Sequence, residues 1–217
     1  MERVTTLEEA YNILNGNLIG LREIKNSKRL QSFLNFANIS DDQVQNVPFC
    51  RDELSQKKET HLLILVIPDH ISNKVLNLKH FRDFFGLDPE EQEPCFYNQD
   101  WYINEAFFTI STLKFQWLLV EKKISEKSRG IDPNIFENGV FQLNSALLFT
   151  YVFFIYYLTK NQILWENDFV WCSDYDTNND QIYVGRYLDS NKINKNGFSI
   201  HRHLKIKNNY GVSNIIQ

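Results

Sequence analysis

Residues 146–158 (ALLFTYVFFIYYL) form the stretch that decides the fold we predict for this chain. The run is almost entirely apolar or aromatic, and an α-helix that is apolar on every side is packed between other layers of a protein. A membrane-spanning helix needs about 20 such residues, more than this run provides. We therefore predict a buried central helix over residues 144–160 and no membrane span.

The sequence after this helix alternates short strand-like runs with turn-forming residues. Residues 169–173, 181–187 and 198–206 are the strand candidates, and Asp- and Asn-rich segments separate them. Such spacing is typical of neighbouring antiparallel strands. We predict a C-terminal antiparallel β-meander.

The sequence before the helix contains both helical and strand-like patterns. Thr6 and Glu9 form a capping-box pattern, and a second helix is expected to start near Ser27. Residues 40–60 are polar and predict a loop. The apolar run 61–67 predicts a strand buried on both faces, followed by a helix capped by Ser72 and by a strand over 115–123.

These elements predict a single α+β domain over residues 1–217. It would contain N-terminal helices, a small mixed sheet, one very apolar central helix and the C-terminal meander. The net charge of −4 argues against a dedicated nucleic-acid-binding protein, although a local basic patch stays possible. Three isolated cysteines, no CxxC pair and no signal-peptide pattern predict a cytoplasmic protein.

The turn 174–180 raises the possibility of a metal site. Asp174, Asp176, Asn178 and Asp180 supply oxygen atoms at alternate positions, as calcium loops do. Gly185 stands where an EF-hand needs Glu, so only a looser calcium loop is compatible with the sequence. Asp and Asn also dominate ordinary hairpin turns, and we favour that interpretation.

Two arginines of the meander fall on predicted core-facing positions. Strand alternation groups Arg186 with Ile182 and Val184, and Arg202 with Ile200 and Leu204. A buried arginine needs an anionic partner, because an unpaired charge in the core is very costly. We favour internal ion pairs with acids of the turn over the alternative, an anionic ligand gripped by both arginines.

The opposite face of the last strand carries a histidine pair. His201 and His203 alternate with Ser199, Lys205 and Lys207, which predicts an exposed basic face. Such a face would suit an anionic partner or protect a sheet edge.

A nuclease interpretation rests on residues at the ends of two predicted strands. Asp69 follows the strand 61–67, while Glu121 and Lys123 end the strand 115–123. The set resembles the PD…(D/E)xK pattern, in which two acids hold a divalent metal and a lysine stabilises the attacking water. The pattern is short, so we keep it as an alternative.

The segment 98–105 interleaves polar and aromatic side chains in a way typical of binding surfaces. Asp100, Trp101, Tyr102 and Glu105 are its candidate binding residues. The same residues would also suit a core plug followed by a helix cap, and the sequence does not choose between the two.

The sequence thus favours a non-enzymatic binding or interaction protein of bacterial type, such as an immunity-like or accessory factor. Its expected partner is another protein; nucleic acid is possible but not favoured, and no cofactor is predicted. A metal-dependent nuclease and a calcium- or anion-binding domain are the alternatives, so whether the chain is an enzyme is left open.

Overall fold

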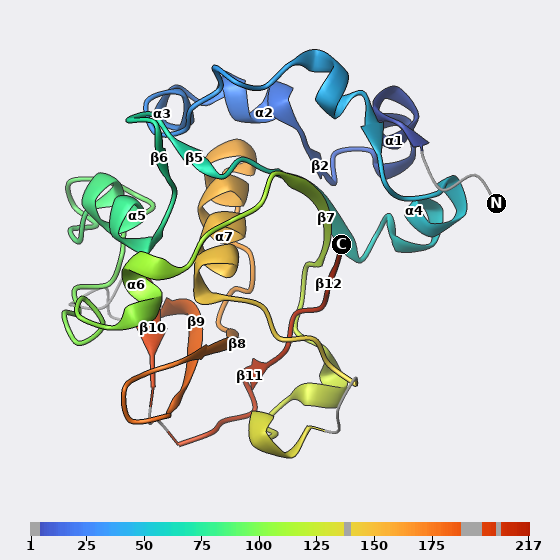
Figure 1. The fold of residues 1–217 in the computed structure, drawn as a ribbon. Helices are drawn as coiled ribbons and strands as arrows, with labels where there is room; N and C mark the ends of the chain where they lie inside the picture. The colour runs from blue at the N-terminus through green and yellow to red at the C-terminus, as the bar shows by residue number, and fades with distance from the viewer. Residues whose placement is uncertain (1–4, 137–139, 188–196, 203–204) are drawn as a thin grey trace.

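A computed structural model describes residues 5–136, 140–187, 197–202 and 205–217. Helix α7 (Ala146–Lys160) lies in the middle of the molecule and strands of both four-stranded sheets border it (Figure 1). The chain is α+β, as predicted. One hydrophobic cluster extends from Ala10 to Ile215 and joins α7 to both sheets.

Helix α7 forms where the apolar run predicted it. Ser145 caps its start by accepting a hydrogen bond from the Leu148 N–H at 3.2 Å, and Asn161 ends it in the left-handed conformation. The hydroxyl of Tyr151 donates to the Leu65 carbonyl at 2.9 Å and accepts from the Ile67 N–H at 3.0 Å. The helix is therefore tied to the strand beside it by a fully buried polar contact. Among the described residues, no helix has the length and apolar character needed to cross a bilayer.

The first sheet is mixed, in the order β12-β7-β4-β2. β2 runs parallel to β4, whereas β4 and β7 pair antiparallel with Leu63 opposite Leu119. Every residue of β4 is buried, which agrees with a strand covered on both faces. The four strands are β2 (Leu18–Ile19), β4 (His61–Val66), β7 (Gln116–Glu121) and β12 (Ile215–Ile216).

The second sheet has the order β10-β9-β8-β11. Its first three strands form the predicted antiparallel meander, and the short β11 pairs parallel to β8. The last predicted strand, 198–206, is observed as a strand over Gly197–His201, and residues 203–204 of that range lie outside the described residues. The strands are β8 (Phe169–Tyr175), β9 (Gln181–Tyr187), β10 (Gly197–His201) and β11 (Tyr210–Gly211).

The N-terminal helices are shorter and more numerous than predicted. The capping box between Thr6 and Glu9 starts the first helix. The helix expected from Ser27 starts there but ends at Gln31, and a further short helix precedes Ser27, whose extended backbone separates the two. The helices are α1 (Leu7–Leu14), α2 (Leu21–Asn26) and α3 (Lys28–Gln31).

The segment 40–60, predicted as a loop, contains regular structure. Its polar residues lie on the exposed sides of short elements, while Val44, Val47 and Leu54 enter the core. A two-stranded sheet joins this segment to the start of the chain. The elements are η1 (Asp41–Val44), β3 (Asn46–Val47) with its partner β1 (Thr5–Thr6), and α4 (Arg51–Lys57).

A small hairpin follows β4 in the chain and occupies the position where we predicted a helix cap. Ser72 lies in the hairpin turn, and Asn77 caps α5 by accepting from the His80 N–H at 3.0 Å. The remaining elements are β5 (Asp69–His70), β6 (Lys74–Val75), α5 (Leu78–Phe85), α6 (Ala106–Ile110), η2 (Glu126–Ser128) and η3 (Pro133–Ile135).

Candidate functional site

Residues that the sequence assigns to separate candidate sites lie together around Arg202. Its guanidinium donates a hydrogen bond to the fully buried carboxylate of Asp176, and its Nη1 lies 3.8 Å from Glu105 Oε1. The Arg202 Cζ atom lies 4.4 Å from the centre of the Trp101 ring, within cation–π range. We call these four residues the Arg202 cluster. Its arginine is held by an internal carboxylate.

The electrostatics of Asp176 follow from these contacts. Burial by itself raises the pKa of Asp176, but the Asp180 N–H, the Arg202 guanidinium and the Asn178 N–H all stabilise the carboxylate. The donors outweigh burial, so the pKa of Asp176 lies below its usual value. The cluster therefore holds an ionised acid in the protein interior.

The same contacts argue against the calcium loop that Asp174, Asp176, Asn178 and Asp180 offered as an alternative. Asp176 Oδ1 accepts from two backbone N–H groups of the turn, at 2.8 and 2.9 Å, and its other oxygen faces an arginine. Asp174 points elsewhere and accepts from the Ala146 N–H at the start of α7. Within the described ranges no three His, Cys, Asp or Glu side chains are grouped to hold a metal ion. The turn is an ordinary Asx-type turn.

Arg186 also finds an internal carboxylate, but not the predicted one. Its Nη2 lies 3.0 Å from Glu93 Oε1, outside the meander, and its side chain is 9% exposed. Arg29 approaches the same segment and donates to the Glu93 carbonyl. The acidic segment 88–94 thus supplies a partly buried ion pair.

The other candidate binding residues are divided between surface and core. Asp100 is exposed and accepts from Arg82, whereas Tyr102 is completely buried and belongs to the core. His201 is half-buried, with its ring 5.4 Å from that of Phe169, so the predicted outward face is wrong at this position. The cause is the second hydrophobic cluster, which lies on this face of the sheet and places the Tyr183 ring 5.7 Å from that of His201. His203 lies outside the described residues.

Asp69 lies far from Glu121, so the residues of the nuclease hypothesis do not form one site. In the β4–β7 register Glu121 lies opposite His61, while Val66 lies opposite Gln116 and Asp69 follows beyond it. A rise of about 3.3 Å per residue separates the two strand ends by about 17 Å. Asp69 and Glu121 cannot share one ion, because each ligand oxygen must lie within about 2.6 Å of it. The metal site of that hypothesis is therefore wrong.

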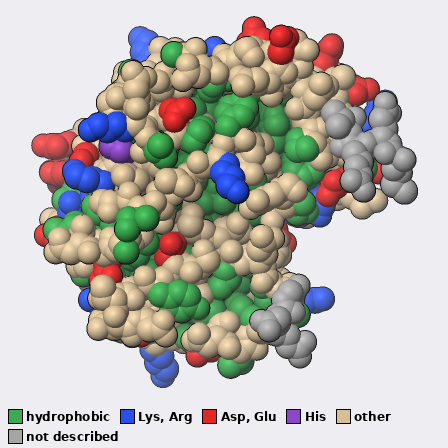
Figure 2. All heavy atoms as spheres, in the orientation of Figure 1, with side chains coloured by type: hydrophobic (Ala, Val, Ile, Leu, Met, Phe, Trp, Pro, Cys, Tyr) green, Lys and Arg blue, Asp and Glu red, His purple; other side chains and the backbone are tan. Residues whose placement is uncertain are grey.

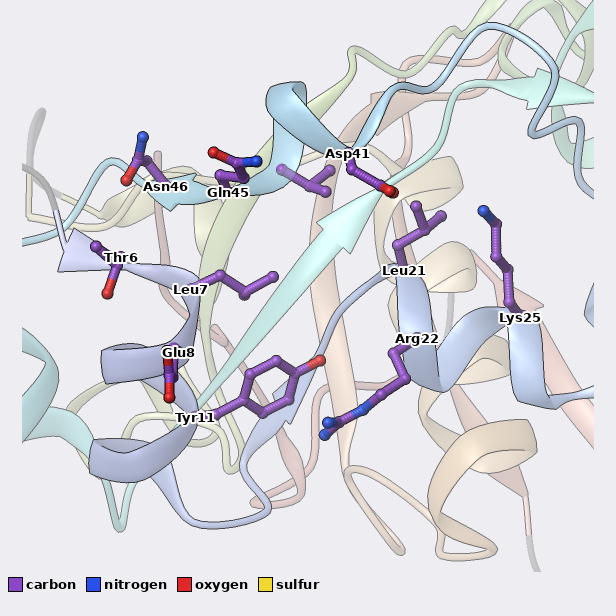
Figure 3. A pocket seen from close by; sticks show the side chains of 11 residues that line it. Thr6, Leu7, Glu8, Tyr11, Leu21, Arg22, Lys25, Asp41, Gln45 and Asn46 are labelled. Carbon is purple, nitrogen blue, oxygen red and sulfur yellow. The ribbon is translucent and has the colours of Figure 1, made fainter.

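The N-terminal half contains a hollow that sequence reasoning missed, which we call the N-terminal groove. It has a volume of about 580 Å³ and lies between α1, α2 and η1 (Figure 3). Its floor consists of Leu7, Tyr11, Leu21 and Val44. Its rim is polar and consists of Thr6, Glu8, Arg22, Lys25, Asp41, Gln45 and Asn46. The volume and the apolar floor are typical of binding pockets.

A set of three hydrogen-bonded side chains lies at the edge of the groove, and two of them, Tyr11 and Arg22, line it. The Tyr11 hydroxyl donates to Glu23 Oε2 at 2.5 Å, and Arg22 Nε donates to Glu23 Oε1 at 2.9 Å. The Arg22 Cζ atom lies 4.2 Å from the centre of the Tyr11 ring. Figure 3 shows Tyr11 reaching from α1 toward Arg22 on α2. We call these three residues the Arg22 cluster.

Burial and hydrogen bonds set the protonation of the Arg22 cluster. Burial raises the pKa of Glu23, but donors from Tyr11, the Gly20 backbone and Arg22 outweigh it and leave that pKa below its usual value. Burial and the neighbouring Glu23 raise the pKa of Tyr11. The phenol thus stays a donor and the acid stays ionised, which fixes the positions of both partners.

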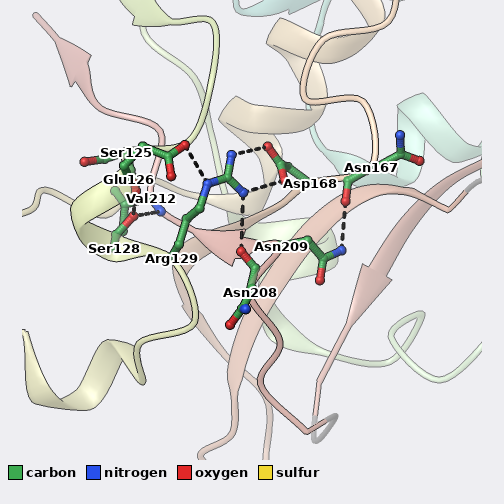
Figure 4. Close-up of polar contacts among 9 residues, drawn as sticks. All are labelled: Ser125, Glu126, Ser128, Arg129, Asn167, Asp168, Asn208, Asn209 and Val212. Carbon is green, nitrogen blue, oxygen red and sulfur yellow. Dashed lines mark hydrogen bonds and ion pairs between the residues drawn. The ribbon is translucent and has the colours of Figure 1, made fainter.

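A further arginine network fastens the last part of the chain. Arg129 makes a bidentate pair with Asp168, at 2.8 and 3.0 Å, and donates to Glu126 at 2.7 Å (Figure 4). The two carboxylates raise the pKa of Arg129 above its already high value. Its Nη1 also donates to the Asn208 carbonyl at 3.3 Å. These bonds join η2 to the segments before β8 and β11, so we assign the network a structural role.

The contacts of Arg22, Arg129 and Arg202 are the basis on which we assign a role to each arginine. Arg22, Arg129 and Arg202 each pair with a carboxylate of the chain, and Arg22 also lines the N-terminal groove. Comparisons with protein-family models, curated proteins and solved structures find no match to this chain.

Proposed function

We propose that this protein is a non-enzymatic binding protein that recognises another protein through the N-terminal groove. The observation that supports it is the Arg22 cluster at the edge of an apolar floor. Tyrosine and arginine are enriched among the residues that carry most of the energy of protein interfaces. The groove offers both, next to apolar surface that a partner would cover.

The fixed geometry of the cluster favours binding. Glu23 holds the Tyr11 hydroxyl and the Arg22 guanidinium before any partner arrives. Side chains that are already ordered lose less conformational entropy when an interface forms. Arg22 nevertheless stays accessible, since its side chain is 68% exposed.

The rim suggests a polypeptide partner rather than nucleic acid. Glu8 and Asp41 lie on the same rim as Arg22 and Lys25, so the groove lacks the uniformly basic surface that a phosphate backbone requires. With the overall charge of −4, this arrangement fits an immunity-like or accessory factor. We place it in the cytoplasm, a proposal that rests on its cysteine usage.

Affinity capture from the native host tests the proposal. Wild-type protein is compared with the double variant Arg22→Glu, Lys25→Glu, and the captured proteins are quantified by mass spectrometry. The matched control is Arg51→Glu, because Arg51 is 66% exposed and lies outside the groove. We expect one protein to be captured by the wild type and the control, and about tenfold less by the double variant, the loss typical of a central interface residue.

Two results would contradict the proposal. One is the absence of any protein enriched by the wild type over an unrelated bait. The other is equal capture by wild type and double variant, which would move the interface away from the groove. Circular dichroism of each variant separates loss of binding from loss of folding.

A further inference from the structure

We propose that two neutral histidines, His70 and His80, hold the β5–β6 hairpin closed, and that the hairpin opens when mild acid protonates them. The hairpin consists of residues 69–75 and packs between the segment 33–35 and α5 (Figure 1). By closed we mean this packed position. The hairpin residues are not part of the N-terminal groove, so the inference does not depend on the proposed function.

Backbone hydrogen bonds and one ring contact keep the hairpin closed. The Asn35 N–H donates to the Asp69 carbonyl at 2.9 Å. The Ile71 N–H donates to the Phe33 carbonyl at 3.0 Å. The His70 ring packs edge-on against the Phe33 ring, with centres 5.3 Å apart. His70 therefore lies where the hairpin meets the rest of the protein.

The hydrogen bonds of His70 require a neutral ring. Its Nδ1 accepts from the Ser72 N–H at 3.2 Å and lies 2.8 Å from the Ser72 hydroxyl. A backbone N–H can only donate, so Nδ1 must carry a lone pair and the single proton of the ring lies on Nε2. A proton on Nδ1 would place two N–H groups against each other and break the turn that Ser72 forms.

His80 is equally unsuited to a second proton. Its ring stacks on that of His70, with centres 4.7 Å apart and planes 10° from parallel. Its Nδ1 is buried and has no hydrogen-bond partner among the described residues. A proton on that atom would be a buried charged donor without an acceptor, and two charged imidazoles at this distance would repel each other.

The charged groups that act on the pair are Lys74, Lys79 and Asp83. Lys74 lies opposite His70 in the hairpin. On α5, Lys79 and Asp83 form a salt bridge at 2.5 Å, so the acid is already paired. The segment 33–35 has no titratable side chain. Figure 2 shows histidine surface beside Lys and Arg side chains at the place where Figure 1 draws β6 and α5. The surroundings are therefore net positive.

Burial and this charge favour the neutral form of both histidines. Burial, followed by the charges of His80 and Lys74, lowers the pKa of His70. Burial and then Lys74 lower the pKa of His80, although Asp83 acts in the opposite direction. Because both folded pKa values are lowered, the stabilisation of the closed hairpin is complete above the open-state pKa of about 6.5. It is lost as the pH falls from there through the folded values.

Hydrogen exchange of single amides, followed by nuclear magnetic resonance, tests the inference in the wild-type protein. The Asn35 and Ile71 amides report the closed hairpin, and protection factors remove the intrinsic effect of pH on exchange. Between pH 7.5 and 5.5 we expect their protection to fall about tenfold or more, the change for one imidazole that titrates near pH 6.5 only when the hairpin is open. Far-ultraviolet circular dichroism should be the same at both pH values. A loss of that signal at pH 5.5 would assign the acid effect to the whole fold and overturn the inference.

Variants show whether the two histidines cause the loss of protection. In His70→Asn, His80→Phe the asparagine Oδ1 can accept from the Ser72 N–H, the phenyl ring can stack, and neither side chain titrates. We expect equal hairpin protection at both pH values. The control His201→Gln changes a histidine of β10 and should retain the wild-type loss.

Three results would overturn the inference. The first is constant protection of Asn35 and Ile71 in the wild type. The second is an equal loss in the wild type and the double variant. The third needs no variant: titration of the His70 and His80 ring signals should give midpoints below about 6.5, and midpoints at or above that value would show that the closed hairpin does not exclude the proton.

Discussion

The Arg202 and Arg22 clusters are built from the same chemical parts but differ in burial. Each stacks an arginine on an aromatic ring, at 4.4 Å and 4.2 Å, and pairs it with an acid. Arg202 is 23% exposed and its partner Asp176 is fully buried, whereas Arg22 is 68% exposed. A buried pair fixes the fold, because losing one partner leaves the other charge unpaired. A pair whose arginine is exposed contributes less to stability, and that arginine remains accessible to a partner.

The largest effect is expected from breaking the buried pair. Arg202→Ala leaves the Asp176 carboxylate buried without its arginine, and we expect a loss of about 2–3 kcal/mol in the free energy of unfolding. Urea denaturation followed by circular dichroism measures it. The control Arg82→Ala removes an arginine whose partner, Asp100, is 73% exposed, and should cost less. An equal loss in both variants would contradict the comparison.

Lowering the pH should weaken the ion pair between Arg202 and Asp176. Because the pKa of Asp176 is lowered in the folded protein, its contribution to stability is complete above the unfolded pKa of about 3.9 and is lost as pH falls through the folded value. The difference in unfolding free energy between wild type and Arg202→Ala should therefore shrink below about pH 4. Denaturation series at several pH values measure this, and a difference that grows toward acid pH would refute the assignment.

A smaller effect is expected from the Arg22 cluster when its internal hydrogen bond is removed. Tyr11→Phe deletes the hydroxyl that donates to Glu23 and keeps the ring, so we expect a loss of about 1 kcal/mol. Tyr157→Phe, at another half-buried tyrosine, is the control. Thermal unfolding of both variants provides the measurement, and a Tyr11→Phe protein as stable as the control would show that this bond is replaced by water.

The smallest stability effect is expected from the exposed arginine itself. Arg22→Gln keeps much of the side-chain length and removes the charge, and we expect no measurable change in the thermal midpoint. The same variant should still lose affinity for the captured partner described above. A clear drop in the midpoint would mean that Arg22 has a structural role like that of Arg202.

Local patterns in the sequence predicted the main elements of the fold. The continuous apolar runs became β4 and α7, and the Thr6–Glu9 pair became the capping box of α1. These signals are contained within a few residues, so one sequence is enough to recognise them. The antiparallel meander was predictable for the same reason.

Contacts between distant segments were not predictable in this way. Arg186 pairs with a glutamate 93 residues away, and the segment 95–97 turns the edge strand β10 into a covered one. The floor of the N-terminal groove combines Leu7 and Tyr11 with Leu21 and Val44 from other elements. Nothing in their spacing identifies them as neighbours, because tertiary packing alone brings them together.

The outer strands β11 and β12 connect the end of the fold to both sheets. β11 pairs with β8, and β12 pairs with β7, so residues 210–216 complete one edge of each sheet. A nascent chain can close neither edge until these residues have left the ribosome. A product terminated before Tyr210 would leave one edge of β7 and one edge of β8 without a partner strand, and such edges are templates for aggregation. Closure of both sheets therefore depends on residues 210–216.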